Sequence, residues 1–337
     1  MRKFYQIFVV ILVTIGFPFF SSAQNYFFSD VSERSIALNG ARRVIVPQKF
    51  RTVGLDRVAL KQFLWSLPSE KNVHNRINVP VLELPMPDGR ISRFRVWESS
   101  IQESALEAKF PEIKTFTGQG IDDPYATIRF DFTPRGFHAQ VLTVNGTYYI
   151  DPYAVGITDS YISYFRTDLS KNNNFVCEVI DNPSNPSSNF TTAACRGTEM
   201  RTYRLAVACT GEYAQAPGIS AGANAAVLHG AIVTSVNRVV GVYEKEVSLR
   251  MVLVANNNIV EYLDAATDPF NGNNNANTLI NESQTVIDAN IGSANYDIGH
   301  TFSTGGGGLA QLRSPCGTSK ARGITGSSNP TGDAYDI

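Results

Sequence analysis

From residue 200 onward, the sequence alternates between short apolar stretches and long helical ones, and this alternation constrains the fold more than any other feature. Residues 200–209, 247–256 and 296–303 are rich in β-branched and aromatic residues, which favours strands. Residues 222–246 and 277–292 carry apolar side chains at spacings of three and four, which predicts helices. Because a helix between two strands makes a crossover connection, the sequence predicts a largely parallel sheet with right-handed crossovers.

The first half of the chain has a different pattern, dominated by short strands and turns. Asn145-Gly146 lies between two apolar runs, as in a β-hairpin. A helix is expected over residues 55–68, with Val58, Phe63 and Leu67 on its apolar side. Strands are expected over residues 91–99, 125–132, 136–144 and 147–153.

A stretch rich in Asn, Ser, Thr and Pro, residues 181–200, has no apolar periodicity and is predicted to be a linker. It separates a β-rich region, residues 24–180, from the alternating region, residues 201–337. The predicted fold class is α+β: a β-rich N-terminal domain, followed by a domain with a mixed, mostly parallel sheet and crossover helices.

The N-terminus has the pattern of a signal peptide. Arg2 and Lys3 precede a short apolar run that contains Pro18 and ends in small residues at Ala23. A membrane anchor is the alternative, but the run is short for a span. No later segment is expected to have the length and apolarity of a membrane span. We therefore expect residues 1–23 to be removed and the protein to be secreted.

Composition narrows the partners and the redox chemistry. A formal net charge of −1 gives no reason to expect nucleic acid or a membrane as a partner. The cysteines are Cys177, Cys195, Cys209 and Cys316, and no CxxC pair occurs among them. In an oxidising compartment, four cysteines allow two disulfides in three arrangements, and the sequence does not choose between them.

Residues that would carry chemistry are scarce. The only histidines are His74, His138, His229 and His300, and no HExxH motif occurs in the sequence. The glycine run at residues 305–308 lacks the other residues of a phosphate-binding loop, and "DPFNGNNNAN" at residues 268–277 does not fit a calcium loop. Packed, hydrogen-bonded histidines and a polar turn are the simpler interpretations.

Four stretches nevertheless carry a close resemblance to a known family. The sequence resembles exported bacterial reprolysin-like zinc metallopeptidases of the metzincin clan, and the resemblance covers residues 201–337. A looser resemblance makes residues 40–170 similar to the family's N-terminal pro-region. The stretches are "RTYRLAVACTGEYA" (201–214), "AAVLHGAIVTSVNRVVGVYEKEVSLRMVLVANN" (225–257), "IGSANYDIGHTFSTGGGGLAQL" (291–312) and "KARGITGSSNPTGDAYDI" (320–337).

The resemblance implies zinc-dependent hydrolysis of peptide bonds in extracellular proteins. In this clan three histidines of an H-E-x-x-H-x-x-G-x-x-H helix bind Zn²⁺, and the Glu acts as general base. The motif follows the sheet, and the present sequence stops at Ile337, before it. We therefore expect a fragment of a metallopeptidase precursor. It lacks zinc ligands and catalytic residues, and it should be inactive as given.

The resemblance also gives the glycine run a role. In metzincins an antiparallel strand at the sheet edge binds the substrate through main-chain hydrogen bonds. Residues 305–308 are expected to turn the chain into this strand. Gly308, Leu309 and Ala310 would then bind a peptide or protein substrate. The alternative is a glycine-rich loop with no contact role.

The β-rich region is implied to be a pro-region that acts as an intramolecular inhibitor of the cleft. Cys177 could supply a thiolate that maintains latency, or it could form a disulfide, for example with Cys195. Two other classes of protein remain open. One is a non-enzymatic secreted adhesin or binding protein with a degenerate metzincin-like half domain. The other is a secreted inhibitor built from the β-rich region.

Overall fold

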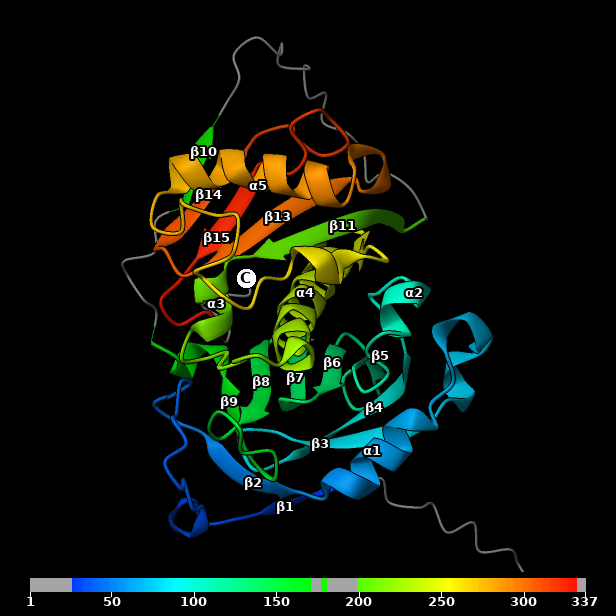
Figure 1. The fold of residues 1–337 in the computed structure, drawn as a ribbon. Helices are drawn as coiled ribbons and strands as arrows, with labels where there is room; N and C mark the ends of the chain where they lie inside the picture. The colour runs from blue at the N-terminus through cyan, green and yellow to red at the C-terminus, as the bar shows by residue number, and fades with distance from the viewer. Residues whose placement is uncertain (1–25, 171–176, 181–198, 332–337) are drawn as a thin grey trace, which may run out of the picture.

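Four layers follow one another in the computed structural model of the chain, which describes residues 26–170, 177–180 and 199–331 (Figure 1). A curved sheet of the N-terminal half comes first. One long helix lies between this sheet and a second sheet, and another helix covers the far face of the second sheet. The predicted signal peptide, residues 1–23, and nearly all of the predicted linker, residues 181–200, lie outside the described residues.

The first sheet is antiparallel throughout and curls until its ends meet. Its strand order is β1-β2-β9-β8-β7-β6-β5-β4-β3, and a bridge between Tyr26 and Glu83 joins the chain before β1 to β3. In the described residues its strands are β1 (Phe28–Asp30), β2 (Arg51–Leu55), β3 (Val81–Pro85), β4 (Ile91–Glu98), β5 (Lys114–Gly120), β6 (Thr127–Thr133), β7 (Gly136–Thr143), β8 (Gly146–Pro152) and β9 (Ser160–Phe165).

The predicted strands of this half are confirmed as β4, β6, β7 and β8. The hairpin predicted at Asn145-Gly146 joins β7 to β8, with Thr143 opposite Gly146. Gly146 has φ of 126°, a conformation that glycine adopts without the steric penalty of other residues. The turn therefore sets the register of the pair.

Helix α1 (Arg57–Trp65) confirms the predicted helix, and of the three residues predicted on its apolar side Phe63 and Leu67 pack in the core whereas Val58 does not. Leu60 and Leu64, four residues apart, point into the sheet and are fully buried, whereas Val58 is 69% exposed. The Asp56 carboxylate accepts a hydrogen bond from the backbone N–H of Ala59 at 2.9 Å and so starts the helix. This start places Val58 in the first turn, away from the core.

The second sheet is mixed and has the order β10-β14-β15-β13-β11-β12. Strands β12, β11, β13 and β15 are parallel, while β14 is antiparallel to β15 and parallel to β10. In the described residues they are β10 (Cys177–Ile180), β11 (Arg201–Cys209), β12 (Leu249–Leu253), β13 (Ile298–Ser303), β14 (Gly307–Gln311) and β15 (Gly323–Gly326). Short helices in the described residues are α2 (Ser104–Glu107), α3 (Gly211–Gln215), η1 (Glu33–Ser35), η2 (Glu70–Asn72), η3 (Arg76–Asn78), η4 (Arg166–Asp168), η5 (Asn257–Val260) and η6 (Ser293–Asn295).

Both faces of the second sheet are buried by crossover helices, as predicted. Helix α4 (Ala225–Val247) connects β11 to β12, and α5 (Ala276–Asn290) precedes β13. Alternate residues of β11 serve the two faces: Leu205 and Val207 pack in the core that contains α4, and Ala206 packs in the core that contains α5. The α+β class, the parallel strands and the two helices are therefore confirmed.

Helix α4 is buried on nearly all sides because a sheet covers it from each side (Figure 1). The Asn224 side chain caps its start by accepting hydrogen bonds from the N–H groups of Ala226 and Val227. Its length and a mean hydropathy of 1.4 would suit a membrane span, so the prediction that no later segment has these properties is wrong. The helix lies between the two sheets, where 72% of the apolar window is buried.

Glycines let α4 approach the first sheet closely, which gives a stability prediction. A Cβ atom at Gly241 would lie 2.9 Å from Arg129 Cγ and 3.1 Å from Gln140 Oε1. We expect Gly241→Val to lower the free energy of unfolding by about 1–3 kcal/mol through overpacking, measured by urea denaturation. Gly306→Ala is the control, because no atom lies within 4 Å of its added Cβ. Equal effects of the two substitutions would contradict the proposed close packing.

Candidate functional site

The glycine run forms the turn between β13 and the chain that enters β14. A Cβ atom at Gly305 would lie 2.1 Å from the Asn273 carbonyl oxygen, so only glycine fits there. The Asn273 side chain supports the turn: its Oδ1 accepts from the Thr304 N–H at 3.1 Å, and its Nδ2 donates to Thr304 Oγ1 at 2.8 Å. The polar loop at residues 268–277 thus serves as the support of this turn.

Strand β14 is antiparallel, as predicted, and contains Gly308, Leu309 and Ala310. Leu309 is buried in the core under α5, and Ala310 is exposed. Strand β15, which lies between β13 and β14, was not predicted. Its four residues, "GITG", are too short and too rich in glycine for the strand pattern to be recognised.

The outer side of β14 is not open, and in this respect the predicted edge is wrong. Strand β10 pairs with it in parallel, with Cys177 opposite Gly308, Glu178 opposite Leu309 and Val179 opposite Ala310. The N–H of Leu312 donates to the Ile180 carbonyl at 3.0 Å and continues the ladder.

Strand β10 comes from the chain before the linker, which makes this pairing informative. Cys177, Glu178 and Val179 are exposed, so main-chain hydrogen bonds rather than buried side chains hold most of the strand. The backbone groups of β14 therefore bind an extended peptide, and in this structure that peptide is a segment of the same chain.

A cavity of about 450 Å³ lies on the α4 side of the second sheet, next to β14. Apolar residues such as Val239, Met251 and Phe302 line most of it, and His300 is one of the polar residues in its lining. His300 Nε2 lies 2.9 Å from Thr325 Oγ1 on the neighbouring strand. Burial lowers the pKa of His300 to about 4, so its imidazole is neutral at pH 7.

The other buried histidines also have structural partners. His229 Nδ1 lies 2.8 Å from Glu261 Oε1, its Nε2 lies 2.6 Å from Gln102 Oε1, and its ring stacks on Phe110. His138 Nδ1 lies 2.9 Å from Asp131 Oδ1. These contacts agree with packed, hydrogen-bonded histidines.

Among the described residues, Cys177, Cys209 and Cys316 are free. Cys177 and Cys316 are exposed, while burial raises the pKa of the Cys209 thiol well above its ordinary value. Cys195 lies outside the described residues, so the disulfide considered for Cys177 stays a prediction. What the structure adds is the position of Cys177 in β10, directly opposite Gly308.

The C-terminal half also matches a known family. The model of the metallo-peptidase family M12B, reprolysin-like, matches residues 199–337. Residues 199–337 are therefore similar to a reprolysin-like metallopeptidase. This family region begins just before β11 and contains β14, the strand to which β10 is paired. No curated protein matches the chain.

Two solved structures show distant likeness. Metalloproteinase-II from Bacteroides fragilis is 10% identical, with 79% of this chain and 82% of that chain covered and a TM-score of 0.41. A chain from a chaperone–substrate complex is also 10% identical, with 43% of this chain and 92% of that chain covered and a TM-score of 0.26. Both TM-scores are too low to support an argument about fold or function.

Reprolysin-like peptidases are in general zinc-dependent, but the residues described here do not make a zinc site. Within residues 26–170, 177–180 and 199–331, no three His, Cys, Asp or Glu side chains are grouped so that they could hold a metal ion. The contacts of His138, His229 and His300 with Asp131, Glu261 and Thr325 agree with this.

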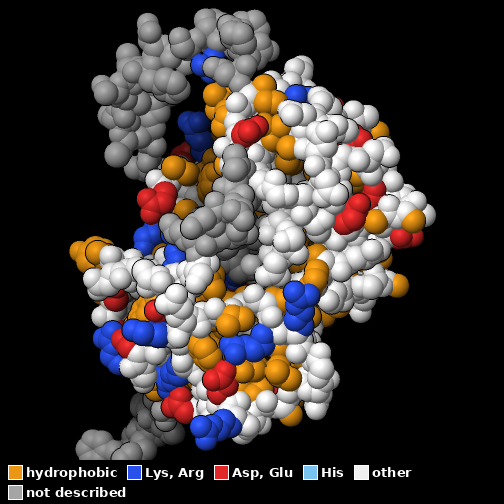
Figure 2. All heavy atoms as spheres, turned by 90° about the vertical axis from the view of Figure 1, so that its left-hand side faces the viewer, with side chains coloured by type: hydrophobic (Ala, Val, Ile, Leu, Met, Phe, Trp, Pro, Cys, Tyr) orange, Lys and Arg blue, Asp and Glu red, His pale blue; other side chains and the backbone are white. Residues whose placement is uncertain are grey.

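The face of the molecule that carries β10 has an uneven distribution of charge. Figure 2 shows basic and acidic side chains interspersed over the lower part of this face, which belongs to the N-terminal half. The upper part, which belongs to the reprolysin-like half, has fewer charged groups between uncharged ones. The predicted absence of nucleic acid and membrane as partners is not tested by this view.

The low pKa of His300 predicts a loss of stability in acid. Between pH 6.5 and about pH 4, the unfolded chain binds a proton at His300 that the folded chain does not bind. The free energy of unfolding should therefore fall by about 2 kcal/mol from pH 7 to pH 5 because of this group. Urea denaturation at both pH values should show a smaller fall for His300→Gln, and an equal fall would contradict the assignment.

The pairing of β10 with β14 predicts an exchange pattern. The Ile180 carbonyl accepts a hydrogen bond from the Leu312 N–H. In a parallel ladder the N–H and the C=O of one residue point to the same neighbouring strand, so both groups of Ile180 face β14 and both groups of Val179 face away from it. Ile180→Pro removes the N–H that Ile180 directs at β14. The loss of a hydrogen bond worth about 1 kcal/mol should weaken the pairing, so that the Leu312 amide exchanges with deuterium about fivefold faster. Val179→Pro is the matched control and should leave this rate unchanged. If both variants exchange alike, β10 does not protect β14.

Proposed function

We propose that this chain is part of the precursor of a secreted, zinc-dependent metalloendopeptidase. The match of residues 199–337 to the reprolysin-like family supports the peptidase class. The basic residues, apolar run and small residues of positions 1–23 support export. Because the described residues supply no zinc ligands, the chain as given is proposed to have no peptidase activity of its own.

In this proposal Gly308, Leu309 and Ala310 bind the main chain of a substrate peptide. The observation that carries it is the pairing of β10 with these three residues. A strand that adds to a sheet edge is recognised through its backbone, so β14 accepts peptides of varied sequence. An extended segment of an extracellular protein would take the place that β10 now occupies.

The N-terminal half, up to β10, is proposed to keep the precursor latent. Strand β10 and a substrate peptide would compete for the same backbone groups of β14, so latency follows from occupation of the edge. A cut in the linker, residues 181–200, would convert β10 from a tethered strand into a chain end. Strand β10 would then be held at β14 from its N-terminal side alone, which lowers its effective concentration there and admits substrate.

Cys177 is placed to add to this latency. Its side chain is exposed on β10, at the register position of Gly308. A thiolate at this position could bind the metal of a complete catalytic centre, and a disulfide could instead stabilise the strand. Both roles lie on the segment that the proposed cut would release.

We expect the product of the complete gene to gain peptidase activity as trypsin cuts the linker, for which Arg196 and Arg201 are nearby sites. The segment is rich in Pro, Ser, Asn and Thr, the composition that proteases cut most readily. Hydrolysis of a fluorogenic peptide is measured against the fraction of cut chain, and a chelator should abolish it. Full activity of the uncut protein would refute the proposed inhibitory role.

Cys177→Ser separates the two roles of the cysteine in the same assay. Activity without a cut would indicate that the thiolate maintains latency. A lower folding yield with latency intact would indicate a disulfide.

A further inference from the structure

The N-terminal half contacts the reprolysin-like half in two different ways. One contact is β10 on β14, in which three of four strand residues are exposed. The other is the packing of β6 and β7 against α4, which is buried. The contact at α4 therefore removes more surface from water than the contact at β14, and it is the stronger of the two.

Small and polar residues of α4 fit the surface of β6. Gly230, Thr234, Asn237 and Gly241 recur every three or four residues and so lie along one side of the helix. A Cβ atom at Gly230 would lie 3.1 Å from Thr133 Cβ. Thr234 Oγ1 donates to Asp131 Oδ1 at 3.0 Å, and Asn237 Nδ2 donates to the Phe130 carbonyl at 3.0 Å.

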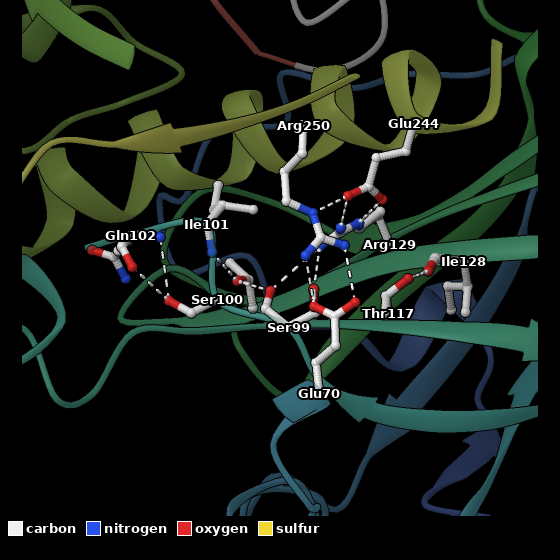
Figure 3. A network of polar contacts seen from close by, with 11 residues as sticks. Glu70, Ser99, Ser100, Ile101, Gln102, Thr117, Ile128, Arg129, Glu244 and Arg250 are labelled. Atoms are coloured by element: carbon white, nitrogen blue, oxygen red, sulfur yellow. Dashed lines mark hydrogen bonds and ion pairs between the residues drawn. The ribbon is translucent and has the colours of Figure 1, made fainter. Parts of the chain in front are cut away.

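Ion pairs join the two halves across the same boundary. Arg129 of β6 binds Glu244 of α4, and its side chain is only 3% exposed. Figure 3 shows that Glu244 also meets Arg250 of β12, which in turn makes a two-point contact with Glu70 at 2.7 and 3.0 Å. Arg129 is buried, so its charge is compensated by a carboxylate of the other half.

A further buried pair lies deeper along α4. Arg238 donates to Asp151 of β8 at 2.5 Å, and the two side chains are 3% and 1% exposed.

On the other side of the helix, residues 101–103 add to the edge of β12: the N–H of Leu253 donates to the Ile101 carbonyl at 2.8 Å. Ile101, Leu106 and Phe110 then enter the same apolar core as α4.

From these contacts we infer that the cut protein is a stable complex of two chains, in which the N-terminal half stays bound to α4 while β10 leaves β14. The partner of the side of α4 that faces β6 is thus the β6–β8 region of the same protein, which the cut makes a separate polypeptide. This inference rests on the proposed cut in the linker. It makes the N-terminal sheet a lasting part of the processed protein, and β10 the only inhibitory element that the cut must release.

The test uses the full chain with the recognition sequence of a site-specific protease inserted in the linker after Ser188. After complete cutting, gel filtration at about 1 µM should give a single peak that contains both fragments, as for complexes with dissociation constants well below this concentration. The Leu312 amide should at the same time exchange faster than in the uncut chain. Two separate peaks, or an unchanged amide in a single peak, would overturn the inference.

Matched variants assign the binding to the α4 boundary. Glu244→Gln removes the charge that faces Arg129 and should raise the dissociation constant of the cut complex at least about tenfold, because a buried charge loses its partner. Asp122→Asn is the control, since Asp122 pairs with Arg93 on an exposed part of the N-terminal sheet. It should change the constant by less than about twofold. Similar effects of both variants would contradict the assignment.

This experiment is independent of peptidase activity. In a longer protein that also carries a zinc-binding helix, a persistent complex without peptidase activity would leave the inference standing and remove the proposed function. Activity that appears only after the fragments separate would support the proposed function and overturn the inference.

Discussion

The burial of α4 between two sheets is the interaction on which the rest of the structure depends. A helix that is buried on nearly all sides needs two covering layers, and neither half of the chain supplies both. The first sheet covers one side through β6 and β7, and the second covers the other through β11 and β12. The two halves therefore share one core, and the buried pairs of Arg129 and Arg238 fix their relative position.

The sequence predicted well those elements whose pattern is local. The strands and helices from residue 200 to 303, and the hairpin at Asn145-Gly146, follow from side-chain spacing and turn chemistry, and all are present. The apolar side of α1 could not be assigned reliably, because it depends on where the helix starts, and Asp56 decides this. Helix α4 has the composition of a membrane span, and only the presence of two covering sheets shows that it is a core helix.

The candidate site shows the limit of such predictions. The antiparallel strand at Gly308, Leu309 and Ala310 is predicted by the resemblance to metzincins, which the glycine run and the apolar residues after it only support. The strands on both of its sides, β15 and β10, have only four residues each and carry no recognisable pattern. Their pairing is determined by long-range contacts, which leave no periodic signal in a single sequence. For the same reason the ion pair of Arg129 with Glu244, which are 115 positions apart, was not foreseen.

Segments of the N-terminal half cover both edges of the second sheet, and this has a consequence for the protein before it is processed. A strand with free backbone groups pairs readily with strands of other molecules, and this is a common route to aggregation. Here residues 101–103 cover β12 and residues 177–180 cover β14, both from the N-terminal half. The same segments that precede the reprolysin-like half in the chain therefore shield its sheet from other copies. Such shielding matters most while many newly made copies are crowded together.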